Sequence, residues 1–278
     1  ARWVSYLNSN CQKDDKVKYK MLVMGRHGQG YHNVAESFYG TPAWNCYWAE
    51  KTGNGTITWE DPVLTDAGTA EAVKANGFFK SAFETGGLPY FESYYSSPLK
   101  RCIQTSEITF GNLTLPPNHQ FHPVIKENFR ESISIHTCDH RSTKSEIEAF
   151  AGPRFRFEKG FSEEDKLWHK TEGETSAGQS ARNKIVLDDV FTNDESSWIS
   201  ITAHSGEIAS LLGVLNHRKF SLSTGQVIAV LVKAEIVEPT ATTSVVAFTP
   251  EATCNSPPVT SISGQGCVCS DAPAPTGK

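Results

Sequence analysis

The spacing of apolar residues along the chain changes repeatedly between the period of a strand and that of a helix. An apolar run over residues 19–24 ends at Gly25 and is typical of a buried strand. Further strands are expected over residues 93–96, 198–202, 226–237 and 243–248, and helices over residues 65–85, 97–109, 182–191 and 205–215. This alternation predicts an α/β fold: a three-layer sandwich with a mostly parallel central sheet covered by helices on both faces, plus insertions forming a cap.

Polar residues at the expected helix starts indicate how these helices are capped. Either Thr65 or Asp66 can cap the first long helix. Ser97 is expected to cap the next helix, with Pro98 at its first position, and Ser205 is expected to cap a later one. The apolar stripe of the first long helix is expected to face the sheet, and comprises Ala67, Ala70, Val73, Phe78, Phe79, Ala82 and Phe83.

Two segments lack a sustained hydrophobic period. Residues 31–61 hold tryptophans and tyrosines among glycine, asparagine and proline, and we interpret them as an insertion near the functional site. Residues 124–179 are charged and aromatic, show no clear strand, and are interpreted as a second insertion that roofs a pocket. The chain is expected to form one domain over residues 1–249, followed by a cysteine- and proline-rich tail over residues 250–278.

Composition argues against two classes of partner. The 278 residues are 38% hydrophobic and 21% charged, which is enough apolar surface for a sizeable core. The formal charge is −5 and the pI is near 6.0, so no broad basic surface suits a nucleic acid. No apolar stretch approaches the roughly 18 residues that cross a bilayer, so no membrane partner is expected. Any attraction for an anionic substrate must therefore be local.

The cysteines indicate an oxidising environment. There are seven, and three of them fall in the tail. Together with sequons at Asn54 and Asn112, which predict N-glycosylation, they favour a secreted protein or one of the secretory pathway. Disulfides are expected to tie down the N-terminal arm and the tail, with Cys102 as the free thiol of an odd set. Ala1 in place of Met is what removal of a signal peptide, or of a tag, leaves behind.

Cationic and imidazole side chains follow the ends of expected strands. Arg26 and His27 come after the first strand, and His204 follows the strand over residues 198–202. These strand ends are where open α/β sheets hold their ligands. Arg101 lies in the first turn of a helix, where the helix dipole also favours an anion. Such residues suit a phosphoryl group, whose charge is spread over its equatorial oxygens during transfer.

Taken in this order, these segments resemble the histidine phosphatase superfamily, in its phosphoglycerate mutase-like branch. The stretch from Leu64 to Gly68 matches as well, as the Leu-Thr-x-x-Gly step before the family's first long helix. The resemblance implies that His27 accepts the phosphoryl group, and it implies no metal or other cofactor. The phosphate ligands that it implies are Arg26, Asn33, Arg101 and His204.

The implied chemistry sets conditions on individual groups. His27 must attack through a neutral ring nitrogen, so a backbone carbonyl near Gly28 is expected to hold its other N–H. An imidazolium at His204 is expected to offset phosphate charge together with the guanidiniums. Glu131 is similar to the family's proton donor to the leaving alkoxide, and its carboxylate can later activate water. Glu127 and Glu207 are the alternatives for this role.

The sequence also departs from the commoner motifs of this branch. Gln29-Gly30 follows the glycine of the first motif, and Ser205 follows His204, where Gly-Glu and His-Gly-Gly are more usual. These departures disfavour a mutase reaction, and we expect hydrolysis of a small phosphorylated substrate. The aromatic insertion is similar to that of fungal members, which fits secretion. Candidate substrate-binding residues are Gln29, Gly30, Ser205, Arg141 and Arg182.

Two other functions stay open, and the oligomeric state is not predicted. The pocket could perform an isomerase or lyase reaction on a carboxylated small molecule, which an activity that survives His27→Ala would favour. The second alternative function is that of a non-catalytic secreted binding protein, with the tryptophan-rich insertion as its contact surface. Neither residues 138–140 nor residues 267–269 offer four metal ligands at convincing spacing, so no metal is expected. The remaining histidines are expected to be satisfied polar groups: His119, His122, His136, His140, His169 and His217.

Overall fold

The computed structural model describes the whole chain except residues 1, 12–15, 238–244, 259–268 and 270–278. The main sheet has six strands in the order β4-β3-β2-β6-β1-β7, and every neighbouring pair is parallel except the antiparallel pair β1 and β7. The strands are β1 (Val17–Arg26), β2 (Ser93–Ser96), β3 (Val124–Ile125), β4 (Arg156–Phe157), β5 (Glu172–Glu174), β6 (Trp198–Ala203), β7 (Val227–Glu235) and β8 (Phe248–Pro250). The mostly parallel sheet expected from the sequence is confirmed.

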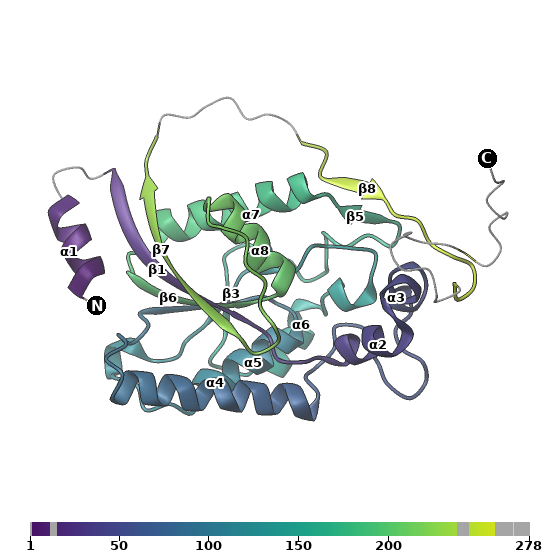
Figure 1. The fold of residues 1–278 in the computed structure, drawn as a ribbon, viewed down its shortest axis with the longest axis horizontal. Helices are drawn as coiled ribbons and strands as arrows, with labels where there is room; N and C mark the ends of the chain where they lie inside the picture. The colour runs from purple at the N-terminus through teal and green to yellow at the C-terminus, as the bar shows by residue number, and fades with distance from the viewer. Residues whose placement is uncertain (1, 12–15, 238–244, 259–268, 270–278) are drawn as a thin grey trace.

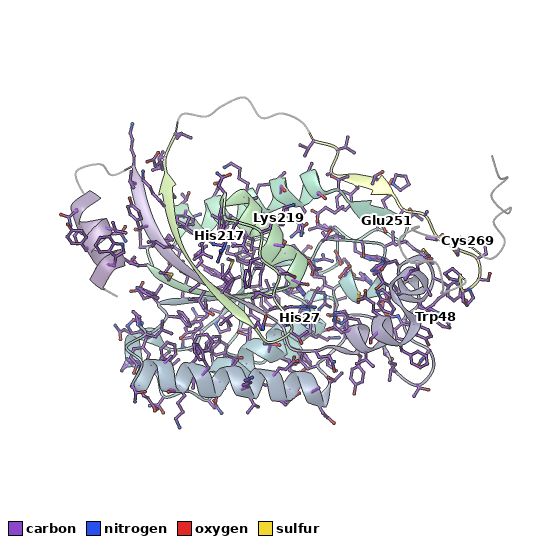
Figure 2. All side chains as sticks on the ribbon, in the orientation of Figure 1. His27, Trp48, His217, Lys219, Glu251 and Cys269 are labelled. Carbon is purple, nitrogen blue, oxygen red and sulfur yellow. A yellow bond between two sulfur atoms is a disulfide. The ribbon has the colours of Figure 1, made fainter. Side chains whose placement is uncertain are left out.

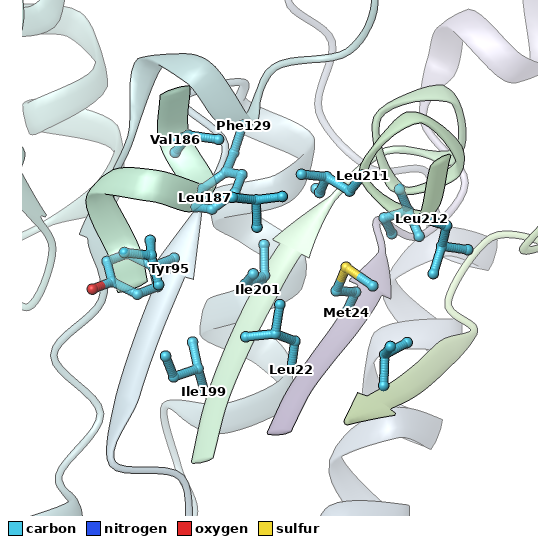
Figure 3. Close-up of a cluster of buried hydrophobic side chains, with 14 of the residues drawn as sticks. Leu22, Met24, Tyr95, Phe129, Val186, Leu187, Ile199, Ile201, Leu211 and Leu212 are labelled. Carbon is cyan, nitrogen blue, oxygen red and sulfur yellow. The ribbon is translucent and has the colours of Figure 1, made fainter. Parts of the chain in front are cut away.

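Helices cover both faces of this sheet, with α7 and α8 on one side and α4 and α5 on the other (Figure 1). The helices are α1 (Arg2–Cys11), α2 (Tyr31–Tyr39), α3 (Thr41–Cys46), α4 (Asp66–Glu84), α5 (Lys100–Phe110), α6 (Lys144–Ala151), α7 (Ser176–Asn193) and α8 (Ser205–Val214). Leu22 and Met24 of β1 point into the cluster beneath α7 and α8 (Figure 3), whereas Val23 between them belongs to the opposite cluster. A strand buried on both faces is apolar at every position, which explains the continuous run in the sequence.

The helix starts agree with the sequence only in part. Thr65 caps α4, since its hydroxyl accepts a hydrogen bond from the backbone of the first turn at 3.1 Å. Ser97 does not cap α5, which begins at residue 100, because its hydroxyl bonds to the ring of His204 instead. Ser205 is the first residue of α8 rather than its cap. The first prediction was wrong because α5 starts later than expected, with Leu99 at the cap position, and the second was wrong by one residue, because His204 holds the cap position of α8.

The apolar stripe of α4 is narrower than expected. Ala72, Phe79 and Phe83 are buried, but Val73 and Phe78 are 56% and 57% exposed. Successive helical residues are about 100° apart, so Phe78 and Val73 each lie beyond one edge of the stripe through Ala72 and Phe79. The inward face is therefore set by residues three, four and seven positions apart.

Both insertions are more regular than the sequence indicates. Residues 31–61 form α2, α3 and a short 3-10 turn around a core where Trp44 and Trp59 pack edge to face, with ring centroids 5.5 Å apart. Residues 124–179 contain α6 and the strands β3, β4 and β5, so the expectation of no strand there was wrong. With two or three residues each, these strands are too short to show a period.

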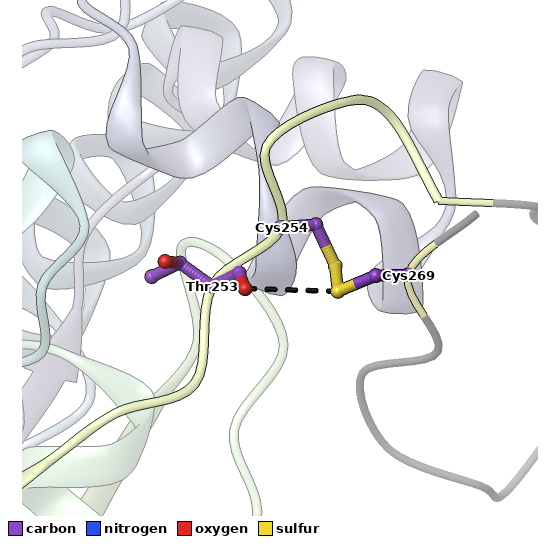
Figure 4. The surroundings of a disulfide bond; sticks show 3 residues. All are labelled: Thr253, Cys254 and Cys269. Carbon is purple, nitrogen blue, oxygen red and sulfur yellow. Dashed lines mark hydrogen bonds between the residues drawn. A yellow bond between two sulfur atoms is a disulfide. The ribbon is translucent and has the colours of Figure 1, made fainter. Parts of the chain in front are cut away.

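The tail is attached to both insertions. β8 pairs antiparallel with β5 of the second insertion, and Cys254 N donates to the carbonyl of Cys46, in the first, at 2.9 Å. β8 begins where the strand expected over residues 243–248 was to end, and it crosses the expected domain boundary after residue 249. The first two residues of that expected strand lie outside the described residues. A disulfide joins Cys254 to Cys269 (Figure 4).

The other cysteines agree with the sequence as far as they are described. Cys102 is free and buried, as expected, and Cys138 is a second buried free thiol. Cys46 is also disulfide-bonded. The expected attachment of the N-terminal arm falls on the side chain of Cys11, outside the described part of the chain. None of the described helices is both long enough and apolar enough to cross a membrane.

Candidate active site

Two parallel strands bring the predicted histidines together. β1 and β6 pair with Arg26 opposite Ala203, and the backbone N–H of His27 donates to the carbonyl of Ala203 at 3.0 Å. His27 and His204 therefore follow at the same edge of the sheet, with ring centroids 5.1 Å apart, and both are buried. Figure 2 shows His27 at the end of the sheet nearest α2. The convergence expected from the strand ends is found.

His27 is held in the state that a nucleophile needs. Its Nδ1 lies 2.7 Å from the carbonyl oxygen of Gly28, which can only accept, so Nδ1 carries the proton and Nε2 keeps a lone pair. Burial, and after it the cation of Arg101, lowers the pKa of His27 well below its usual value. The ring is therefore neutral near neutral pH, as the implied chemistry requires.

The turn that carries His27 packs backbone against backbone. A Cβ atom on Gly28 would lie 2.3 Å from the carbonyl oxygen of Gly68, and one on Gly68 would lie 2.1 Å from that of Gln29. Such an approach leaves room only for glycine. The N–H of Gly28 also donates to Thr105 Oγ1 of α5 at 3.0 Å. The turn is thus fixed by the first turn of α4 and by the middle of α5, and the contact with α4 links the Leu-Thr-x-x-Gly step to the nucleophile.

Arg101 and His204 form one hydrogen-bonded unit. Arg101 Nε donates to His204 Nδ1 at 3.3 Å, and His204 Nε2 lies 2.8 Å from Ser97 Oγ. The guanidinium also donates to the carbonyl of Cys138 at 2.7 Å and lies 3.5 Å from Asp139 Oδ1. Burial, followed by the charge of Arg101, lowers the pKa of His204 well below its usual value. In the free protein His204 is therefore neutral, and not the imidazolium expected from the sequence.

Arg26 and Asn33 are two further predicted phosphate ligands, and, unlike His204, they belong to the lining of the cavity. Arg26 Nη1 donates to the carbonyl of Leu222 at 2.8 Å, whereas its Nε is buried and has no hydrogen-bond partner among the described residues. Such a donor costs stability unless a ligand pairs with it. Asn33 Oδ1 accepts from the N–H of Gly30 at 3.0 Å, which leaves the amide N–H₂ group for a ligand. Both side chains line the cavity beside His27.

Glu131 lies where a proton donor is needed. Its two oxygens accept hydrogen bonds from the N–H of Ser132 at 3.0 Å and from the N–H of Gly206, at the start of α8, at 3.1 Å. Burial, followed by the charge of Asp139, raises the pKa of Glu131 despite these two donors. A carboxyl group with a raised pKa keeps its proton at a higher pH and is better suited to general acid catalysis.

The alternative carboxylates are engaged elsewhere. Glu127 pairs with Arg141 at 2.9 Å and with Arg130 at 3.0 Å. Glu207 is fully buried 3.6 Å from Arg182, and burial raises its pKa to about 8. Neither carboxylate lines the cavity. Among the three candidates, Glu131 is the one placed to act there.

Two arginines assigned to substrate binding support the fold instead. Arg141 is buried and donates to Glu127 and to four backbone carbonyls of the second insertion. Arg182 donates to Glu174 at 2.8 Å and to the carbonyls of residues 128, 130 and 131. Neither lines the cavity, because nearby carboxylates and carbonyls hold both guanidiniums. We therefore assign them to the architecture of the second insertion.

The cavity has a volume of about 180 Å³. Its lining residues are Arg26, His27, His32, Asn33, Glu36, Trp44, Asn45, Arg101, Glu131, His136, Cys138, Asp139 and Ser205. Of the weaker candidates, Ser205 belongs to the lining, whereas Gln29 and Gly30 do not. Gln29 Oε1 accepts a hydrogen bond from Thr65 Oγ1 at 2.8 Å, and the N–H of Gly30 donates to Asn33 Oδ1. His136 faces the cavity, contrary to its expected role as an ordinary polar group. The sequence offers no local signal for His136, because a loop from the second insertion brings it there.

His32 is a functional candidate that sequence reasoning missed. It lies on α2, is 9% exposed, and its ring centroid is 5.4 Å from that of His27. Its Nδ1 is buried and has no hydrogen-bond partner among the described residues. Burial, followed by the charge of Arg101, lowers its pKa, so it lines the cavity as a neutral imidazole. Its position five residues after the nucleophile, at the start of the helix that follows the nucleophile's turn, was the available signal.

One cluster of potential metal ligands adjoins the site. Ligand atoms of His136, Cys138 and Asp139 all lie within 4.8 Å of one another. The guanidinium of Arg101 already lies 3.5 Å from Asp139, and a fixed cation there disfavours a second one. The predicted glycosylation sites, Asn54 and Asn112, are both exposed, and their modification stays a prediction.

Comparisons with known proteins agree with this geometry. A family model described as histidine phosphatase superfamily (branch 1) matches residues 22–235. A probable phosphoglycerate mutase of Arthroderma benhamiae is 45% identical over 219 residues, covering 79% of this chain and 65% of that protein. Phosphomutase-like protein 3 of Candida albicans is 37% identical over 217 residues, covering 78% and 66% respectively. Probable phosphoglycerate mutase PMU1 of Saccharomyces cerevisiae is 32% identical over 237 residues, covering 78% and 80%. The chain thus spans just under two thirds of the first two relatives.

Proposed function

Because the chain belongs to branch 1 of the histidine phosphatase superfamily, we propose that it hydrolyses phosphate monoesters through a phosphohistidine on His27. One observation carries this proposal. His27 is neutral, its Nδ1–H is held by the carbonyl of Gly28, and its Nε2 lone pair is left at a cavity that Arg26 and Arg101 also line. This is the arrangement that phosphoryl transfer to nitrogen requires.

The first step transfers the phosphoryl group. The Nε2 lone pair forms a bond to phosphorus while the bond from phosphorus to the ester oxygen breaks. Arg26 and Arg101 offset the charge on the equatorial oxygens, and a proton from Glu131 passes to the leaving alkoxide. In the second step the Glu131 carboxylate takes a proton from water, the water oxygen bonds to phosphorus, and the bond to Nε2 breaks. Inorganic phosphate is released and both side chains return to their starting states.

Hydrolysis is favoured over a mutase reaction by the same departures noted in the sequence. Gln29 bonds to Thr65 and to the start of α4, and Ser205 begins α8 in place of the usual glycine. The relatives named as probable phosphoglycerate mutases make the mutase the natural competitor. We also propose that the chain works in the secretory pathway or outside the cell, and the Cys254–Cys269 disulfide supports an oxidising compartment.

The test is hydrolysis of 4-nitrophenyl phosphate across about pH 4 to 8, with and without vanadate. Wild type is expected to turn over and to be inhibited by vanadate, which resembles the transferring phosphoryl group. His27→Ala is expected to abolish turnover, whereas His217→Ala, which removes a histidine outside the cavity, is expected to keep it. If well-folded wild type shows no turnover of any phosphate ester, the proposal fails and carboxylated metabolites become the next substrates to screen.

A further inference from the structure

The cavity is lined by both basic and acidic side chains. Arg26, His27 and Arg101 make up what we call the phosphate end. The rest of the lining includes three carboxylic acids, Glu36, Glu131 and Asp139, which we call the acidic wall. Because the cavity has a volume of only about 180 Å³, the leaving group of a phosphate ester held at the phosphate end comes close to these acids. The charges of the wall therefore bear on the choice of leaving group.

The acidic wall is formed by three separate segments. Glu36 is on α2 of the first insertion, whereas Glu131 and Asp139 come from different turns of the second. Asp139 lies 3.5 Å from the guanidinium of Arg101, and its Oδ2 accepts a hydrogen bond from Ser134 Oγ at 2.6 Å. These contacts hold the Asp139 carboxylate in place beside the phosphate end. The carboxylates of Glu131 and Asp139 are thus fixed parts of the cavity, whereas Glu36 is half-buried and accepts a hydrogen bond from Thr41 Oγ1 at 3.1 Å.

No further lysine or arginine among the described lining residues remains to pair with a second acid group on the substrate. Arg26 and Arg101 are the only lysine or arginine residues among the described lining residues, and both belong to the phosphate end. Arg101 is further engaged by Asp139 and by the carbonyl of Cys138. Arg141 and Arg182, which could have served a second anion, are held by carboxylates away from the cavity. Trp44 and Asn45, which also line the cavity, carry no charge.

We infer that the cavity selects phosphate monoesters of uncharged or cationic alcohols and disfavours esters that carry a carboxylate, such as 3-phosphoglycerate. The inference deepens the proposed function and rests on it for the placement of the phosphate. Two carboxylates a few ångströms apart in a partly desolvated cavity repel strongly, whereas an ammonium or hydroxyl group is attracted or accepted. A phosphate dianion already balances the two arginines, so a further anion meets an excess of negative charge.

Binding to His27→Ala tests this independently of turnover. The matched ligands are glycerol 3-phosphate and 3-phosphoglycerate, which differ mainly in a hydroxymethyl group against a carboxylate, with phosphoethanolamine as the cationic ester. Calorimetry at neutral pH is expected to give 3-phosphoglycerate a Kd at least about tenfold higher than that of glycerol 3-phosphate, and phosphoethanolamine a Kd no higher than that of glycerol 3-phosphate. Adding Glu36→Gln to the His27→Ala variant is expected to reduce the ratio of the Kd for 3-phosphoglycerate to the Kd for glycerol 3-phosphate about threefold or more. The control Glu84→Gln removes the same charge from the exposed end of α4 and is expected to leave this ratio of Kd values unchanged.

Each outcome decides the inference. Binding of 3-phosphoglycerate as tightly as glycerol 3-phosphate, or more tightly, overturns it. A ratio of the two Kd values that Glu36→Gln leaves unaltered also overturns it. Failure of all three esters to bind overturns it as well, since the phosphate end would then not hold phosphate. Turnover by wild type addresses the proposed hydrolysis alone. Selective binding without turnover would keep the inference and reject the hydrolysis.

Discussion

Replacing Glu131 by glutamine removes the transferable proton while nearly preserving the size of the side chain. The two carboxylate oxygens accept from the N–H groups of Ser132 and Gly206, at 3.0 and 3.1 Å, and an amide can satisfy only one of these donors. One unpaired buried N–H costs about 1–3 kcal/mol, so we expect a modest loss of stability. The loss of general acid catalysis is expected to be larger, about 10²- to 10⁴-fold in rate, or about 3–5 kcal/mol of barrier.

The assay that separates these two effects compares leaving groups. A nitrophenolate leaves without protonation, so Glu131→Gln is expected to slow the transfer step from 4-nitrophenyl phosphate only slightly. An alkoxide needs the proton, so the full loss is expected for an alkyl phosphate such as glycerol 3-phosphate. Rapid-quench measurement of phosphohistidine formation isolates this step from the later hydrolysis, in which Glu131 acts as a base. Equal losses for both esters, or no loss for either, would refute the assigned role.

The pKa values of His27 and Glu131 together should set the dependence of activity on pH. Burial lowers the pKa of His27 below 6.5, so the nucleophile is neutral, and activity is kept, until the pH falls through that lowered value. Burial raises the pKa of Glu131 above 4.5, so the proton donor is lost only as the pH rises through that raised value. For an alkyl phosphate we expect a bell-shaped profile of kcat/KM with its maximum on the acid side of neutrality. Glu131→Gln should flatten the alkaline limb, and a wild-type profile that keeps rising above pH 7 would contradict the assignment.

Two further substitutions test the geometry around the nucleophile. His32→Ala is expected to lower vanadate affinity and kcat/KM about tenfold or more, because it removes a buried imidazole that lines the cavity; vanadate inhibition as strong as that of the His217→Ala control would argue against a role for His32. Gly68→Ala places a Cβ atom 2.1 Å from the carbonyl of Gln29, and we expect a loss of stability of about 1–3 kcal/mol or more together with reduced kcat. The control is Gly77→Ala on the same helix, where the new Cβ atom meets nothing within 4 Å, so the free energy of unfolding is expected to rise by about 0.5–1 kcal/mol. Urea unfolding measures both variants, and equal stability of the two would contradict the reasoning.

The strands that position the nucleophile could be predicted because they are buried on both faces. The centre of β1, from Met21 to Met24, is apolar, and every residue of β6 is buried, so the side chains that follow these strands could be placed together. Thr65 could be predicted as a cap because its hydroxyl acts within the first turn of its own helix. Local signals therefore gave the central strands, the first long helix and the convergence of His27 with His204, but not the short strands β3 and β4 of the same sheet.

Residues whose partners are distant in sequence could not be assigned in this way. Arg141 appears in the sequence as a free cation, but the fold places Glu127 against it, and Arg182 meets Glu174 similarly. Ser97 looked like a helix cap, but a ring that follows it by 107 positions takes its hydroxyl. Of the acidic wall, the sequence indicated Glu131 but not Glu36 or Asp139, because these two residues lie on separate elements and share no motif. Such contacts depend on the tertiary structure and not on local pattern.

The attachment of the tail ties together two parts of the cavity that are far apart in sequence. The insertions that contribute Trp44 and Asp139 to the cavity are braced by β8 and by Cys254, whereas the nucleophile directly follows β1. Under the proposed function, changes in the tail are therefore expected to act first on the insertion side of the cavity, which also carries Glu131, and less on His27. Exchanging this tail between related chains, and comparing both their substrate profiles and their rates of phosphohistidine formation, would measure this effect.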